Sequence, residues 1–154
     1  MKTLTVGDQA PDFELPDQDG TPTRLSTLLL DGPVVLFFYP AAMTGGCTQE
    51  SCHFRDLAAE FAAAGGQRVG ISRDEVSAQK QFADAHGFDY PLLSDPDGTV
   101  AAGFGVKRKL VSYVKRATFV IDTDRTIREV VSSETNFTAH ADQALEALQA
   151  LQRR

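Results

Sequence analysis

The chain has 154 residues, enough for one domain, residues 1–154, that buries about two thirds of the surface exposed by its unfolded chain. Its 15 basic and 21 acidic residues give a net charge of -6, which argues against nucleic acid or an anionic membrane surface as a partner. The N-terminus lacks the apolar segment of a signal peptide, and no later segment approaches about 18 consecutive apolar residues, so we expect a cytoplasmic protein.

The N-terminal part predicts a β-hairpin followed by one helical turn. Residues 8–15 form a short alternating segment, residues 16–20 have the composition of a tight turn, and residues 21–25 return as the second arm. Ser26 is a suitable N-cap for a helical turn over residues 28–30. We therefore expect a hairpin extension ahead of the main fold.

Residues 34–39 are apolar without alternation, which is typical of a strand covered on both faces and indicates the central strand of a sheet. From Cys47 onward the apolar residues recur at helical spacing until glycines 65 and 66 provide a C-terminal stop. Residues 67–72 then predict a second strand. Strand, long helix and strand in this order form a βαβ unit with a parallel pair.

The second half of the chain completes this pattern. The expected elements are a helix over 77–86 ended by Gly87, a short strand within 90–95, a short helix over 100–104, a loop over 107–115, a hairpin of 117–121 and 126–131, and a closing helix over 139–151. A βαβ unit followed by a helix, a ββ hairpin and a final helix is the order of a thioredoxin-like fold. We predict an α/β protein with a central mixed sheet flanked by helices.

Both cysteines lie where the central strand leads into the long helix. A thiol in the first turn of a helix lies among backbone N–H groups that have no partner inside the helix, and these donors favour the thiolate. Cys47 is therefore placed to be a nucleophile, although a free cysteine also packs well as a small buried hydrophobe. Without a signal peptide, two cysteines indicate redox-active, catalytic or incidental thiols rather than a disulfide scaffold.

The second cysteine, Cys52, follows Cys47 at a spacing of five. On a regular helix this spacing separates the side chains by roughly 140° around the axis and about 7.5 Å along it. A disulfide tolerates Cα atoms at most about 7 Å apart. The two thiols can therefore react with each other only if the first helical turns unwind.

The pattern Pro40-x-x-x-Thr44-x-x-Cys47 resembles the active-site signature of the peroxiredoxins, and Thr48-x-Glu50 with Phe54-Arg55-Asp56 extends the match. A cysteine five residues after the first is similar to the bacterioferritin-comigratory-protein or peroxiredoxin Q branch. In that branch the first cysteine is peroxidatic and the second resolves it. Gly45 stands where the branch commonly has proline, which makes the loop less rigid but removes no reacting group.

The resemblance implies a thiol peroxidase without a prosthetic group. Cys47 would attack hydrogen peroxide or an organic hydroperoxide and become a sulfenic acid, and Cys52 would condense with it to a disulfide. Thioredoxin or a similar dithiol carrier would restore both thiols. We expect no metal, because Cys47, Cys52 and His53 do not offer tetrahedral spacing. The preferred hydroperoxide stays open, as does the choice between a monomer and a weak homodimer.

The signature also supplies groups that can bind a peroxide. The Thr44 hydroxyl can accept a proton and donate to the peroxide, the amides of Gly46 and Cys47 can bind its oxygen, and Pro40 would shield the sulfur. Glu50 is assigned to the same pocket. Thr44 could also cap the helix, and Glu50 could also be a favourable acid in its first turn; both structural roles are compatible with catalysis.

Arg116, just before the apolar strand 117–121, resembles the active-site arginine of the family, whose guanidinium can hold both thiolate and peroxide. It could also be a solvated strand-end arginine, and Arg108 and Lys115 are the nearby alternatives. A role as a polar residue at a helix end is enough to explain His140.

Two other functions compete with the peroxidase. One is a redox-sensing protein whose disulfide reports peroxide to a partner without significant turnover. The other, a disulfide oxidoreductase, is weaker because Cys-x-x-Cys is absent.

Overall fold

The computed structural model describes residues 2–111 and 113–154, so Ser112 of the predicted 107–115 loop lies outside the described residues. The elements are, in chain order, β1 (Glu14–Pro16), β2 (Pro22–Arg24), α1 (Leu25–Leu28), β3 (Val34–Phe38), α2 (Gly45–Asp56), α3 (Ala58–Ala63), β4 (Gln67–Ser72), α4 (Val76–His86), β5 (Leu92–Ser94), α5 (Thr99–Phe104), β6 (Ala117–Ile121), β7 (Ile127–Ser132) and α6 (Ala139–Gln152). Among these described elements no helix has the length and hydropathy needed to span a membrane.

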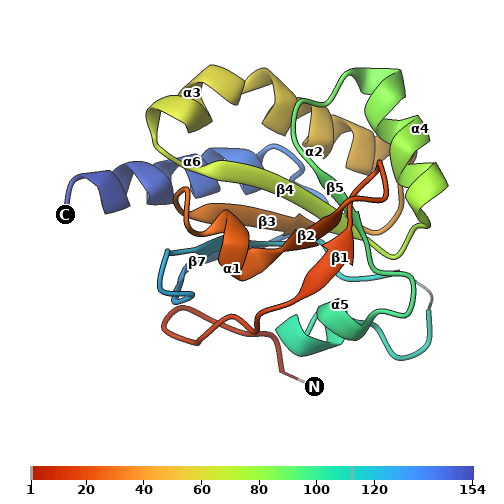
Figure 1. Cartoon of the computed structure of the whole chain (residues 1–154), viewed down its shortest axis with the longest axis horizontal. Helices are drawn as coiled ribbons and strands as arrows, with labels where there is room; N and C mark the ends of the chain where they lie inside the picture. Colours follow the sequence, from red (N-terminus) through yellow and green to blue (C-terminus); the bar gives the residue numbers. More distant parts are fainter. Residues whose placement is uncertain (1, 112) are drawn as a thin grey trace.

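Five strands form one mixed sheet in the order β5-β4-β3-β6-β7, and β1 and β2 form a separate hairpin (Figure 1). β3 is parallel to β4 and antiparallel to β6, β4 is parallel to β5, and β6 is antiparallel to β7. The predicted βαβ unit, the later hairpin and the central position of the apolar strand are therefore confirmed.

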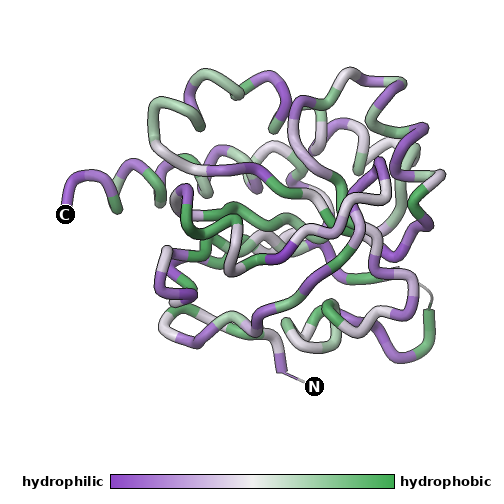
Figure 2. The backbone as a smooth tube through the Cα atoms, in the orientation of Figure 1, coloured by the Kyte–Doolittle hydropathy of each residue, from purple (hydrophilic) through white to green (hydrophobic). Residues whose placement is uncertain are grey.

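Helices α2, α3, α4 and α6 cover one face of the sheet, while α1, α5 and the N-terminal segment cover the other (Figure 1). All five residues of β3 are buried, and they alternate between the two apolar clusters. Val35 and Phe37 belong to the α2 side, whereas Leu36 and Phe38 belong to the α5 side. Apolar residues accordingly concentrate along the central strands (Figure 2). This double coverage explains why the strand sequence does not alternate.

The predicted long helix is divided at Leu57, where φ is -95° and ψ is 21°. Arg68 of β4 donates a 2.9 Å hydrogen bond from Nη1 to the carbonyl oxygen of Phe54. That oxygen thus has a partner outside the helix at the point where the helical ladder is interrupted. The prediction of one continuous helix was wrong because this contact comes from a distant strand.

The predicted N-cap at Ser26 was also wrong. Helix α1 begins at Leu25, and Ser26 lies inside it. The carboxylate of Asp12 accepts hydrogen bonds from the Ser26 amide at 2.9 Å and from its hydroxyl at 2.8 Å. An acid from the preceding segment therefore satisfies the helix start.

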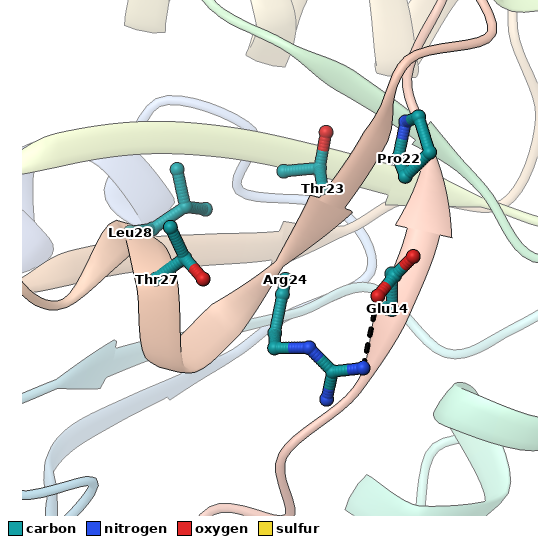
Figure 3. A pocket seen from close by; sticks show the side chains of 6 residues that line it. All are labelled: Glu14, Pro22, Thr23, Arg24, Thr27 and Leu28. Carbon is teal, nitrogen blue, oxygen red and sulfur yellow. Dashed lines mark hydrogen bonds and ion pairs between the residues drawn. The ribbon is translucent and has the colours of Figure 1, made fainter.

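A hollow of about 340 Å³ lies between the hairpin and α1 (Figure 3). An exposed ion pair of 2.9 Å between Arg24 and Glu14 crosses it. The residues lining this hollow include neither cysteine nor any other predicted catalytic residue, so the candidate site must be sought elsewhere.

Candidate active site

The turn after β3 fixes the start of α2. The Tyr39 amide continues the parallel ladder with a 3.0 Å bond to the Ile71 carbonyl, and the Ala42 amide donates to Asp74 Oδ2 at 2.8 Å. Met43 adopts a left-handed conformation with φ of 66°, after which Thr44 returns to an extended conformation as the N-cap. The helix therefore starts at the end of the central strand, with Asp74 holding the turn.

Cys47 is the third residue of α2 and has no exposed surface. It belongs to the apolar cluster on the α2 side, so the alternative of a buried cysteine is correct as far as packing is concerned. The sulfur nevertheless has a cationic neighbour, because Arg116 Nη2 donates to Sγ over 3.5 Å. Since the sulfur is covered, a reactant can reach it only after a neighbouring group moves.

Arg116 reaches the sulfur because of the antiparallel register of β6 and β3. Ala117 pairs with Phe38, so the residue before β6 lies beside the residue after β3. Its Nη1 donates to Glu50 Oε1 at 2.7 Å, and its guanidinium carbon lies 4.8 Å from the centre of the Phe137 ring.

The Arg116 side chain is only 7% exposed, so the alternative of a solvated arginine was wrong. Burial alone would lower the pKa of Arg116, but the neighbouring Glu50 and Cys47 outweigh burial. The pKa of Arg116 is therefore raised. Arg108, a nearby alternative, instead pairs with Glu134 at 3.4 Å.

Glu50 is fully buried and bound to Arg116, so the alternative of a first-turn acid was wrong. Burial raises the pKa of Glu50 to about 8, Arg116 opposes this shift and Glu134 adds to it. The second carboxylate oxygen, Oε2, accepts no hydrogen bond. It lies 3.5 Å from His140 Nδ1.

His140 was missed by the sequence analysis, which gave it only a polar role at a helix end. It is fully buried, with Nδ1 2.7 Å from Thr118 Oγ1 and Nε2 2.8 Å from the Ser133 carbonyl. Burial lowers the pKa of His140. The available signal was weak: Thr118 is a single polar residue within the apolar run 117–121, whereas His140 lies between two alanines in a largely polar segment.

Thr44 is exposed and is the N-cap residue of α2, as the capping alternative predicted, but its side chain forms no cap hydrogen bond. Its hydroxyl donates to the Ala41 carbonyl at 2.8 Å. At Gly46 a Cβ atom would lie 2.6 Å from the Phe137 ring and 3.3 Å from Arg116 Nη2, so the close packing over Arg116 requires glycine. Pro40 lines a neighbouring hollow of about 280 Å³.

Cys52 lies further along α2, which is unbroken between the two cysteines, and both thiols are free. Cys52 is half-buried and, together with Phe137, lines a hollow of about 430 Å³. Burial raises the pKa of the Cys52 thiol, Arg55 lowers it and Asp56 raises it. The second thiol is thus more accessible than the first but separated from it by intact helix.

The sequence model of the AhpC/TSA family matches residues 6–130 of this chain. The chain belongs to the AhpC/TSA family. The crystal structure of peroxidoxin BcpB from Mycobacterium tuberculosis is 64% identical, covers 96% of this chain and 98% of its own, and superposes with a TM-score of 0.93. Peroxiredoxin Q of Xanthomonas campestris is 33% identical, with 90% of each chain covered and a TM-score of 0.82. The chloroplastic peroxiredoxin Q of Sedum lineare is 38% identical over 96% of this chain and 80% of its own.

These relatives confirm the predicted peroxiredoxin Q branch and the thioredoxin-like peroxiredoxin fold. Membership of a peroxiredoxin family supports a thiol peroxidase function. In this AhpC/TSA chain Cys47 and Glu50 each contact Arg116, and Thr44 is the N-cap residue of the helix that carries both. In the described residues no cluster of three or more His, Cys, Asp or Glu residues is arranged to hold a metal ion.

Proposed function

We propose that this peroxiredoxin is a thiol-dependent peroxidase in which Cys47 is peroxidatic and Cys52 is resolving. The contact between Arg116 Nη2 and Cys47 Sγ, 3.5 Å long and at the first turn of α2, is the observation that carries this proposal. A guanidinium and free backbone N–H groups are the donors that favour a thiolate. Cys47 is the cysteine placed next to both.

The reaction has two steps at the protein. The Cys47 thiolate attacks one oxygen of a hydroperoxide, the O–O bond breaks, and the leaving oxygen takes a proton to give water or an alcohol. The resulting sulfenic acid then condenses with the Cys52 thiol to form a disulfide and water. Thioredoxin or a similar dithiol carrier reduces this disulfide and is itself oxidised.

In the first step, donors must bind the peroxide and the charge that develops on its leaving oxygen. The backbone amides of Gly46 and Cys47 and the guanidinium of Arg116 supply these donors. The Thr44 hydroxyl accepts the peroxide proton and donates in return, after leaving the Ala41 carbonyl that it contacts at 2.8 Å. Pro40 limits access from the side of the turn.

Substrates of this site include hydrogen peroxide and alkyl hydroperoxides. A solved structure of the Xanthomonas campestris bacterioferritin comigratory protein, 32% identical and with a TM-score of 0.82, is described in connection with alkyl peroxide reduction activity. That relative supports the second substrate class. A dithiol reductant, a monomer or weak homodimer, and a cytoplasmic location complete the proposal.

The test uses Cys47→Ser and Cys52→Ser with steady-state and single-turnover measurements of peroxide consumption. Cys47→Ser should lose consumption completely, because serine provides no thiolate. Cys52→Ser should retain the first turnover and stall when only the dithiol carrier is present.

Full single-turnover consumption in Cys47→Ser would defeat the proposal. A wild-type protein that forms the disulfide yet shows no sustained turnover with any dithiol donor would favour a peroxide sensor instead. Mass spectrometry of the peroxide-treated protein, compared with the two variants, shows whether the disulfide joins Cys47 to Cys52 of one chain or links two chains.

A further inference from the structure

One buried oxygen in the site has no hydrogen-bond donor. Glu50 Oε2 has no exposed surface and no partner, although Oε1 of the same carboxyl accepts from Arg116 at 2.7 Å. This Oε2 lies 3.5 Å from Nδ1 of His140, whose side chain is also fully buried. An anionic oxygen left without a donor in such a place is costly.

The contacts of His140 fix its tautomer. Nε2 lies 2.8 Å from the Ser133 carbonyl, which can only accept, so Nε2 carries a hydrogen. In a neutral imidazole Nδ1 is then an acceptor, and the Thr118 hydroxyl at 2.7 Å can donate to it. With an ionised Glu50, the charged Oε2 would lie 3.5 Å from an Nδ1 that carries no hydrogen, with no proton between the two atoms.

One additional proton removes this conflict, whichever atom holds it. On Oε2 it gives a neutral acid, which can donate to Nδ1 when the Thr118 hydroxyl turns its hydrogen away, and on Nδ1 it gives an imidazolium facing a carboxylate. The total charge of the pair is zero in both cases. We propose that Glu50 and His140 retain one shared proton between Oε2 and Nδ1 in the reduced protein at neutral pH, which leaves the charge of Arg116 available to Cys47.

The charged groups around the pair agree with this arrangement. Arg116 approaches from the start of β6, Cys47 is on the same helix as Glu50, and Glu134 accepts from the Arg116 amide at 3.0 Å. His53 and Asp142 join α2 to α6 near the surface and bind each other at 2.7 Å. A second anion at Glu50 would therefore compete with a Cys47 thiolate for the same guanidinium. Burial, which raises the pKa of Glu50 and lowers that of His140, favours the proton on Glu50.

Glu50 and His140 are positioning residues here, and their effect on catalysis rests on the proposed peroxidase function. The presence of the shared proton does not depend on that function. NMR between about pH 6 and about pH 10 can detect this proton in the reduced protein, labelled with ¹³C at glutamate carboxyls and ¹⁵N at imidazoles. Glu50→Gln assigns the carboxyl signal, and the chain has only 3 histidines to assign.

At about pH 7 we expect either a protonated Glu50 carboxyl or a doubly protonated His140 ring. An ionised Glu50 beside a singly protonated His140 at that pH would overturn the inference. His53→Gln is the matched control, because His53 is paired at the surface and its loss should leave the Glu50 titration unchanged. This measurement stays decisive even if the protein consumes no peroxide.

A kinetic measurement tests the consequence for Cys47. As the pair loses its proton, its total charge changes from zero to minus one, and the added negative charge competes with the Cys47 thiolate for Arg116. The rate constant of Cys47 oxidation should therefore fall about tenfold above about pH 8. In Glu50→Gln this fall should be absent, because an amide does not ionise. Identical pH profiles for wild type and Glu50→Gln would show that the pair does not control Arg116.

Discussion

Arg116 contacts the reactive sulfur and a buried carboxyl through two different nitrogen atoms of one guanidinium. Nη2 donates to Cys47 and Nη1 donates to Glu50, while the Phe137 ring packs against the same group. This geometry depends on the planar fork of arginine, since a lysine ammonium is a point charge on a flexible stem. A positive charge without the planar guanidinium would therefore not reproduce the contacts with both Cys47 and Glu50.

Replacing Arg116 with lysine should lower the rate constant of Cys47 oxidation about 100-fold, equivalent to about 2.7 kcal/mol of activation free energy. The reason is the loss of directed donation to both Sγ and Oε1. Stopped-flow measurement of a single peroxide turnover checks this value. Arg108→Lys is the control, because Arg108 is bound to Glu134 at the surface. Such ion pairs contribute about 1 kcal/mol or less, so this variant should change the rate constant by no more than about fivefold.

Gly45 and Gly46, the first two residues of α2, allow a second comparison between a variant and its control. A methyl group at Gly46 would meet the Phe137 ring at 2.6 Å, whereas a methyl group at Gly45 meets nothing within 4 Å. We expect Gly46→Ala to cost about 1–3 kcal/mol of unfolding free energy, because the ring over Arg116 must shift. Gly45→Ala should be neutral or slightly stabilising. Urea denaturation of both variants measures the difference, and equal losses would contradict the packing argument.

The sequence indicated the reactive residues because they form a compact motif or adjoin an apolar strand. Cys47 followed from its place at a helix start, and Arg116 from the family resemblance. Phe137 and His140 were not found, since their partners lie far along the chain, as in the contact of His140 with Glu50. Polar residues buried by such distant contacts leave little local pattern.

At the level of elements, α2 holds both thiols on one rigid segment in the reduced protein. Formation of the proposed disulfide requires this segment to unwind, because five helical residues separate the sulfurs by more than a disulfide can bridge. Hydrogen exchange should therefore accelerate over residues 45–52 after one equivalent of peroxide. The β3 and β4 amides should keep their protection, because the central ladder is not involved.

Cys52→Ser is the control for that experiment, since it can reach the sulfenic acid but cannot form the disulfide. Its α2 amides should keep at least about tenfold slower exchange than those of the oxidised wild type. Equal exchange in both proteins would mean that oxidation of Cys47, and not the disulfide, opens the helix. Unchanged exchange in a wild type shown to be disulfide-bonded would contradict the requirement for unwinding.

Periodicity predicted the elements well but not the points where distant side chains interrupt them. The apolar run of β3 and the stop at Gly87, with φ of 62°, were readable because the cause lies within a few residues. The division between α2 and α3 was not readable, because Arg68 must first be brought to the Phe54 carbonyl by the sheet. Element boundaries therefore depend on tertiary contacts that the pattern does not contain.

At the scale of the whole molecule, Asp122 joins the sheet to the C-terminal end of the chain. It follows β6, is 3% exposed, and binds Arg128 Nε at 3.0 Å and Arg154 Nη1 at 2.8 Å. Burial opposes ionisation of this carboxyl. Hydrogen bonds from Arg154, the Thr123 amide and Arg128 outweigh burial and lower the pKa of Asp122.

Because the pKa of Asp122 is lower in the folded state, its ionised form stabilises the protein above its unfolded pKa of about 3.9 and this contribution is lost as the pH falls. Asp122→Asn should cost about 1–3 kcal/mol at about pH 7, since charge-assisted hydrogen bonds are lost. The difference from wild type should shrink progressively as the pH falls below about 4, and it should vanish once the pH is below the lowered folded-state pKa of Asp122, where this carboxyl is protonated too. Asp124→Asn is the control, because Asp124 is 61% exposed and lies 3.8 Å from Arg128. Urea unfolding across this pH range checks the prediction, and a loss that stays constant in acid would show that Asp122 stabilises the fold by packing and not by its charge.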